Sequence, residues 1–327
     1  MCRINAFLVS AFVACFFSPL QNSASAADWP AGQPIKLIVP YAAGSAPDFV
    51  SRKVAEFLTG RLGQSVLVDN KTGASGLIGM QALANSRADG YTFGYGNIAT
   101  MAINPNLFGK LPYDAVKDFN SVIALTSVPN VLVVRSDLPV GSLREFIAYA
   151  KANPSKLAMA SGGTGTTSHL CGELLKVKTG ISYVHIPYQN SPQGIAELMG
   201  GTVDFMVENL SSVLGAVQSG KARALAITSK TRSLILSGVP TMEEAGIPEF
   251  EVSAWGGFIA PAGTPQAIID RLNREINGFA ALPATKREFA QFSATLLGGS
   301  SQAFSQLISD ESKLWGDIIR NNGIKPD

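Results

Sequence analysis

The pattern that most constrains the fold occurs three times: an apolar run, a turn of small residues, and apolar positions at helical spacing. It covers residues 35–63, 66–84 and 157–180. A short apolar run bounded by small residues predicts a buried strand, and the helical spacing predicts the helix that follows it. Strands that alternate with helices favour a parallel sheet, with ligands outside the carboxyl ends of its strands. We therefore predict an α/β fold.

The third turn, residues 161–169, is a candidate anion-binding site. It leads from a strand into a helix that we expect to stop at Gly180. The first turn of a helix leaves backbone N–H groups unpaired, and the helix dipole places partial positive charge there. Glycines allow close approach of a ligand, and five hydroxyls can orient it: Ser161, Thr164, Thr166, Thr167 and Ser168. The alternative is a simple helix cap, which needs only one hydroxyl.

The rest of the chain suggests two lobes. Residues 119–134 form a long β-rich run, which we expect to break at Pro129, and residues 252–260 form a second long strand. Two such crossings predict a discontinuous first lobe, 27–127 with 252–327, and an inserted second lobe, 128–251. Shorter signals predict a loop at Asn104-Pro105, a capping box at Ser142–Glu145, a helix capped by Ser191-Pro192, and amphipathic helices after Thr264-Pro265 and over 301–321.

Residues 1–26 read as a secretory signal peptide. Arg3 gives a positive start, residues 6–17 are apolar, and Ala24-Ser25-Ala26 supplies small residues for cleavage. A lipoprotein signal that uses Cys15 is the alternative. We expect an exported, periplasmic protein in which Cys171 is the sole remaining cysteine, so no internal disulfide can form. Its place in a predicted helix favours a small buried residue over a nucleophile.

Several function classes lack support in the sequence. The net charge is +2 and no basic run occurs, so we expect no nucleic-acid partner. Beyond the N-terminus no apolar run approaches the ~18 residues of a membrane span. We expect no metal or cofactor, because HExxH and CxxC are absent and residues 215–222 only imitate a phosphate loop. A secreted hydrolase would need Ser45 or Ser75 to pair with His169, outside any GxSxG elbow.

Many short motifs, in a characteristic order, carry a resemblance to a known family. The sequence resembles the Bug-type (tripartite tricarboxylate transporter, TctC-like) periplasmic solute-binding proteins from about Trp29 to its end. The motifs lie at residues 40–48, 70–79, 89–92, 104–108, 111–119, 163–170, 185–188, 200–204, 220–225, 239–246 and 260–265.

This resemblance implies a two-lobe type II periplasmic binding protein fold, in which each lobe is a mainly parallel sheet flanked by helices. It implies a non-enzymatic monomer that captures a small carboxylate (a di- or tricarboxylate, an aromatic acid or an amino acid) and delivers it to the membrane components of a tripartite tricarboxylate-type transporter. A ligand-sensing role beside a membrane signalling protein is the alternative. Such proteins hold a carboxylate mainly through backbone groups and water, without an arginine.

The resemblance also implies the binding residues. In the first lobe they are Tyr41, Gly44, Ser45, Asp48, Ala74, Ser75 and Gly76. In the second lobe they are Ser161, Thr164, Gly165, Thr166, Thr167 and His169, with Tyr188 and Glu208 as candidates for specificity.

The chain departs from the family pattern at a few of these positions. Ser45 and Ser75 stand where glycine is common, Gln189-Asn190 replaces Lys-Gly, and Glu208 replaces an aspartate. A glutamate that faces the ligand would repel a second carboxylate and favour an amine or amide. Glu208 as a solvated residue at a strand end is the alternative.

Overall fold

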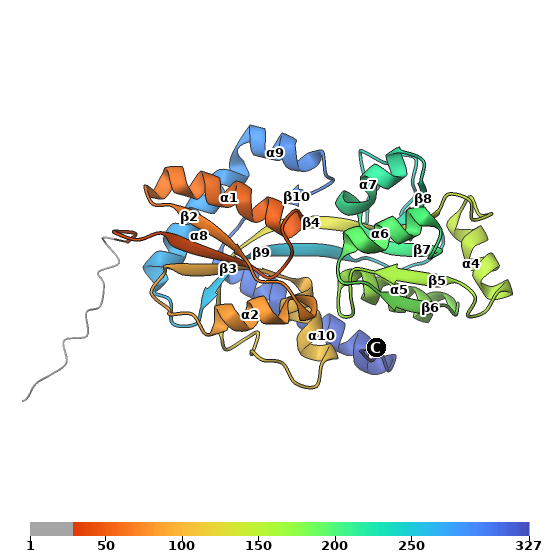
Figure 1. Cartoon of the computed structure of the whole chain (residues 1–327), viewed down its shortest axis with the longest axis horizontal. Helices are drawn as coiled ribbons and strands as arrows, with labels where there is room; N and C mark the ends of the chain where they lie inside the picture. Colours follow the sequence, from red (N-terminus) through yellow and green to blue (C-terminus); the bar gives the residue numbers. More distant parts are fainter. Residues whose placement is uncertain (1–28, 327) are drawn as a thin grey trace, which may run out of the picture.

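The computed structural model describes residues 29–326, so the predicted signal peptide lies outside the described residues. The chain forms two α/β lobes side by side, joined by one long strand and by the segment that leads into another (Figure 1). In the first lobe the strand order is β2-β1-β3-β9-β4, and β1 is parallel to both β2 and β3. These strands are β1 (Ile35–Val39), β2 (Val66–Asn70), β3 (Thr92–Asn97), β4 (Phe119–Arg135) and β9 (Ser253–Pro261), with β10 (Thr295–Leu296) paired to β4.

The second lobe continues from the same long strand. The later part of β4 pairs antiparallel with β7 and β8, and β5 lies parallel between β7 and β6. The strands are β5 (Ala158–Ser161), β6 (Val184–Pro187), β7 (Phe205–Asn209) and β8 (Ala222–Ile227). Because β5, β6 and β7 run in one direction, their carboxyl ends meet at the edge that faces the first lobe.

The strand β4 crosses between the lobes without a break. Its pairing with β9 ends at Pro129 opposite Ser253, and its pairing with β7 begins at Asn130 opposite Asn209. The expected interruption at Pro129 is therefore wrong. A proline removes one N–H from a strand ladder, and here it stands where β4 exchanges one set of neighbours for another, so the strand tolerates it.

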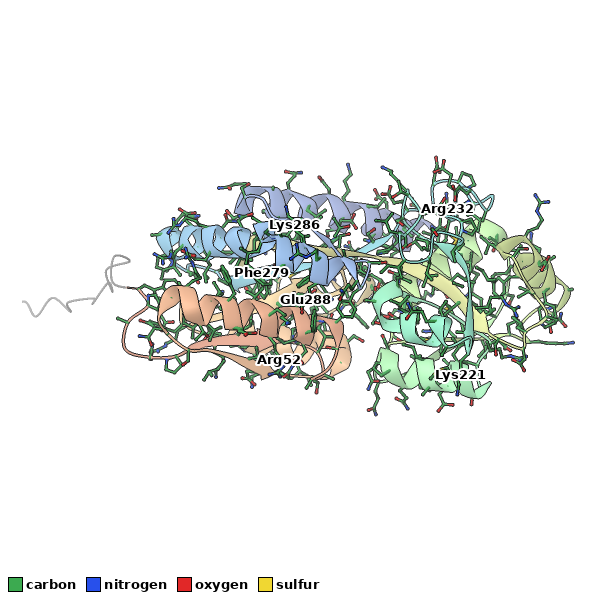
Figure 2. All side chains as sticks on the ribbon, turned by 90° about the horizontal axis from the view of Figure 1, so that it is seen from above. Arg52, Lys221, Arg232, Phe279, Lys286 and Glu288 are labelled. Carbon is green, nitrogen blue, oxygen red and sulfur yellow. The ribbon has the colours of Figure 1, made fainter. Side chains whose placement is uncertain are left out.

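Helices cover both faces of each sheet (Figures 1 and 2). In the first lobe α1, α8 and α9 share one apolar cluster with Phe93 and Phe258, while α2, α3 and α10 pack on the other face. In the second lobe α4 and α5 pack on one face, and α6 and α7 on the other. The helices are α1 (Ala46–Leu62), α2 (Leu77–Ala84), α3 (Asn104–Leu107), α4 (Leu143–Ala152), α5 (Thr167–Thr179), α6 (Ser191–Gly200), α7 (Leu210–Gln218), α8 (Gln266–Ala281), α9 (Pro283–Ala290) and α10 (Ser301–Asn321).

Local signals placed most helix ends correctly. Gly63 and Gly180 end α1 and α5 in the left-handed conformation, and the Ser142 hydroxyl accepts the N–H of Glu145 at the start of α4. Two local expectations are wrong. Asn104-Pro105 opens α3 rather than a loop, because a proline is tolerated in the first turn of a helix. The side chain that caps α6 belongs to Asn190, which leaves the Ser191 hydroxyl for another partner.

The predicted core residue Cys171 is a free, fully buried thiol, as expected, and burial raises its pKa far above the usual range. Residues 215–222 run from α7 into β8, the reverse of the order in a phosphate loop. Within residues 29–326, none of the helices has the length and apolar character that a membrane span requires.

Candidate functional site

The candidate site lies where two of the predicted loops, one from each lobe, touch. The Ser75 hydroxyl donates a hydrogen bond of 2.7 Å to the Thr164 carbonyl across the lobe boundary. Beside this contact, Gly165 packs directly against the side chain of Asn104 from the first lobe. These loops follow β2 and β5, so the structure brings the carboxyl ends of strands from both lobes together.

Asp48 organises the loop after β1 from the first turn of α1. It is 3% exposed and accepts hydrogen bonds from the Gly44 N–H, Arg52 Nε and Asn70 Nδ2, all at 2.9 Å. Burial by itself would raise the pKa of this carboxyl, but the hydrogen bonds and the Arg52 charge outweigh it and hold the pKa below its usual range. Both carboxylate oxygens are thus engaged within the protein, and Asp48 shapes the loop.

Replacing Asp48 with asparagine should cost about 1–3 kcal/mol of stability near neutral pH, because the partly buried hydrogen bonds from the Gly44 N–H and the Asn70 amide lose a charged acceptor. A carboxyl whose folded-state pKa is depressed contributes stability above its unfolded pKa and loses it as the pH falls through the folded value. The difference in free energy of unfolding between wild type and Asp48→Asn should therefore shrink in acid. Urea unfolding between pH 3 and pH 7 measures it, and a difference that grew in acid would contradict the assignment.

Tyr41 joins the ends of three strands. Its hydroxyl donates to Asn97 Oδ1 at 3.0 Å, and its carbonyl accepts from Asn70 Nδ2 at 3.0 Å. Burial raises the pKa of the phenol well above its usual range, so it remains a hydrogen-bond donor at neutral pH. The neighbouring Ser45 occupies the N-cap position of α1, but its hydroxyl donates to the Ala42 carbonyl.

The second first-lobe loop has an unusual backbone. Ala74, Ser75 and Gly76 form a short 3₁₀ turn, η1 (Ala74–Gly76), with φ angles of +47°, +53° and +93°. Left-handed conformations in residues other than glycine are costly and collect at ligand-binding loops and switch regions. This turn is what aims the Ser75 hydroxyl across to Thr164.

In the second lobe the predicted turn is a helix cap built around an ordered loop. The Thr166 hydroxyl accepts the His169 N–H at 3.3 Å and donates to the Gly163 carbonyl at 2.7 Å. The Gly165 N–H, in turn, points to His169 Nδ1 at 3.3 Å. The Thr166 hydroxyl alone therefore caps α5, as a simple helix cap requires. Thr167 is buried as the first residue of that helix.

The two histidines of the chain form one stacked pair. The rings of His169 and His185 lie 4.4 Å apart between centroids and 12° from parallel. His185 Nε2 lies 2.7 Å from the buried Ser161 hydroxyl, so the pair connects the ends of β5 and β6 to the start of α5. The serines considered for a hydrolase bond elsewhere: Ser45 donates to Ala42 and Ser75 to Thr164.

Glu208 lies where two helices, α6 and α7, begin. It is 2% exposed in β7 and accepts the Ser191 hydroxyl and the Asn209 N–H, both at 2.8 Å. Burial raises the pKa of this carboxyl, and hydrogen bonds from Asn209 and Ser191 oppose the rise. The alternative of a solvated residue at a strand end is wrong. Tyr188 is half-buried beside this region, and its N–H donates to the Ser161 carbonyl at 3.0 Å.

Three asparagines that the sequence reasoning did not select also belong to this region. Asn104 and Asn130 are fully buried, and Asn209 is half-buried. Each has a buried amide atom without a hydrogen-bond partner in the described chain: Oδ1 in Asn104 and Asn209, and both Oδ1 and Nδ2 in Asn130. For Asn130 the sequence did offer a signal, namely its position inside the apolar run 119–134, because a buried amide needs a hydrogen-bond partner.

Among the described residues, no group of three or more His, Cys, Asp or Glu side chains could hold a metal ion. Two α/β lobes, joined by β4 and by the segment that enters β9, present hydroxyls, amides and turn backbone to each other. This is the architecture of a periplasmic solute-binding protein of type II.

Comparison with known proteins gives the family. The model of the tripartite tricarboxylate transporter family receptor (TctC) matches residues 50–324, and the chain belongs to this family of periplasmic solute-binding receptors. Protein BugT of Bordetella pertussis is 39% identical over 302 residues, 92% of each chain. The structure resembles R. palustris Rpa4515 with adipate (TM-score 0.88, 34% identity, 92% of this chain and 100% of that one). It also resembles MatC of Rhodopseudomonas palustris with bound malate (0.84, 29%, 89% and 100%).

Proposed function

We propose that this protein captures a small carboxylate-bearing solute between its lobes in the periplasm, performs no chemistry on it, and delivers it to the membrane components of a tripartite tricarboxylate-type transporter. The observation that carries the proposal is the Ser75–Thr164 hydrogen bond, because it joins one predicted binding loop from each lobe. The adipate and malate bound by the two structural relatives support a carboxylate ligand.

The proposed binding residues are the fifteen named from the sequence. Their contacts suggest two roles. Asp48, Thr166 and His169 hold the loops in shape, whereas the turn at residues 74–76 and the Gly165 backbone come closest to the opposite lobe. A ligand enclosed by such loops is held mainly by backbone N–H groups, which suits a carboxylate.

The proposed hinge lies where the strand pairing changes, at Pro129–Asn130 in β4 and at Val252–Ser253 before β9. These positions lie within two residues of the lobe boundaries that the sequence predicts, 27–127 with 252–327 and 128–251. Rotation there would separate Ser75 from Thr164 while each lobe keeps its own core.

The test is calorimetric titration and thermal unfolding of the mature chain with mono-, di- and tricarboxylates, aromatic acids and amino acids. One acid class should bind with saturable 1:1 stoichiometry and stabilise the fold by about 2.7 kcal/mol at a hundredfold excess over Kd. Each acid should be recovered unchanged by chromatography. Turnover of an acid would overturn the proposal in favour of a hydrolase. Failure of the entire panel to bind would overturn the proposal that the ligand is a carboxylate.

A further inference from the structure

We propose that a hydrogen bond between Ser233 and Ser293 is a brace that holds the two lobes in the arrangement in which their binding loops touch. It joins residues 229–239 of the second lobe, which we call the brace loop, to the turn between α9 and β10 of the first lobe. The inference rests on the proposed function, because it concerns the lobe movement that capture of a solute requires.

The contact itself has good geometry. The hydroxyl oxygens of Ser233 and Ser293 lie 2.7 Å apart, which is the usual distance for a hydrogen bond between two hydroxyls. Both residues are half-buried. The contact therefore joins one residue from each lobe at a place that the crossing segments do not supply.

The brace loop is fixed to the second lobe. Arg232 Nε donates to Glu244 Oε2 at 2.8 Å, and the Ile235 N–H donates to the Ser233 hydroxyl at 3.1 Å. The side chains of Ile235 and Leu236 pack against the apolar core under α6 and α7. Ser233 therefore moves with the second lobe.

Ser293 is fixed to the first lobe in the same way. Its N–H donates to the Ala290 carbonyl at 3.0 Å, and the next residue, Ala294, donates to the carbonyl of Phe289 at 3.1 Å. Phe289 is 1% exposed in the first-lobe core. The backbone of Ser293 has φ +53°, a left-handed conformation that is rare outside glycine and collects at clamps and switch regions.

Two contacts thus hold the lobes together at separate places. The Ser75–Thr164 bond lies beside α2, along the bottom of Figure 1, whereas Ser293 follows α9, along the top. A rotation that separates Ser75 from Thr164 must also displace Ser233 from Ser293, because each pair joins the same two rigid bodies. A hydroxyl hydrogen bond is lost beyond about 3.5 Å. The brace therefore opposes opening without contacting the loops that we propose to bind the ligand.

The first test is a cross-link. Ser233→Cys/Ser293→Cys, oxidised with diamide, should form a disulfide; Cys171 is fully buried and does not compete. Hydrogen-exchange mass spectrometry of the mature, ligand-free chain should then show about tenfold slower exchange or more in loops 73–77 and 161–166, because the lobes can no longer separate. Dithiothreitol should restore the original rate.

Ser155→Cys/Ser182→Cys is the matched control. These hydroxyls lie 2.8 Å apart within the second lobe, and Ser155 has φ +57°, close to that of Ser293. Its disulfide should leave exchange in both loops unchanged. If the control pair forms a disulfide and the Ser233–Ser293 pair does not, the brace is wrong. Unchanged exchange in the oxidised Ser233→Cys/Ser293→Cys protein would overturn it as well.

The second test removes the hydrogen bond without a cross-link. Ser293→Ala should speed exchange in loops 73–77 and 161–166 by about two- to tenfold, the equivalent of one typical hydrogen bond. Ser155→Ala, which removes the hydroxyl contact within one lobe, should not change it. Equal exchange in the two alanine variants would contradict the brace. None of these measurements uses a ligand, so failure of the carboxylate panel overturns the proposed ligand class and leaves this test standing.

Discussion

Replacing Gly165 with alanine should weaken binding of the physiological ligand by about tenfold or more, because it obstructs contact between the lobes. A Cβ at this position would lie 2.4 Å from Asn104 Oδ1 and 3.1 Å from Phe108 Cε2, both in the first lobe. Asn104 is fully buried, so it has little room to move away. The lost closure energy appears directly in Kd, at about 1.4 kcal/mol for each factor of ten.

The control for this experiment is Gly180→Ala. Gly180 has φ +69°, close to the +82° of Gly165, so alanine suffers similar left-handed strain, about 1–2 kcal/mol. No atom lies within 4 Å of a Cβ at Gly180, so this variant should lose stability but retain affinity. Calorimetric titration of both variants separates strain from obstruction. An unchanged Kd in Gly165→Ala would show that the Gly165–Asn104 contact is absent from the ligand-bound state.

The largest loss of stability is expected from Gly257→Ala in β9. The added Cβ would lie 2.1 Å from the Ile123 carbonyl oxygen and 2.9 Å from Ala124 Cα, which are backbone atoms of the neighbouring strand. Backbone in the middle of a sheet cannot yield as a side chain can, so we expect a cost of about 3 kcal/mol or more. At about 2–4 °C for each kcal/mol, thermal unfolding should show a Tm lower by roughly 6–12 °C.

Gly278→Ala provides the opposite outcome in the same lobe. Gly278 is exposed inside α8, and a Cβ there meets nothing within 4 Å. Alanine in a helix interior is favoured over glycine by about 0.5–1 kcal/mol, so this variant should unfold at the wild-type temperature or slightly above it. If Gly257→Ala were as stable as Gly278→Ala, the close approach of β9 to β4 would be wrong.

Local sequence patterns predicted most of the elements. The alternation of apolar runs and helical spacing placed β1, α1, β2, β5 and α5 within a few residues, and glycine ended α1 and α5 as expected. These signals work because caps and amphipathic faces depend on residues only three or four positions apart. The errors at Asn104-Pro105 and Pro129 have one cause: proline breaks an element only where its missing N–H is needed.

The candidate site was predicted in part. The sequence selected the loops of Ser75 and Thr164, which the structure brings into contact. It suggested Glu208 as a specificity residue but left open whether that residue was solvated. It missed Asn104 and Asn130, whose unpartnered amides become evident only once their burial is known.

The sequence by itself determined most of the order of strands and helices, and the family resemblance, because each depends on neighbouring residues or on the order of short motifs. It did not predict α3, α9 or β10. Only the tertiary structure decided that Gly165 meets Asn104, and that the starts of α6 and α7 meet at Glu208. Those contacts join segments far apart in the chain. They depend on strand register and on how the faces of two sheets pack, which no local pattern of residues specifies.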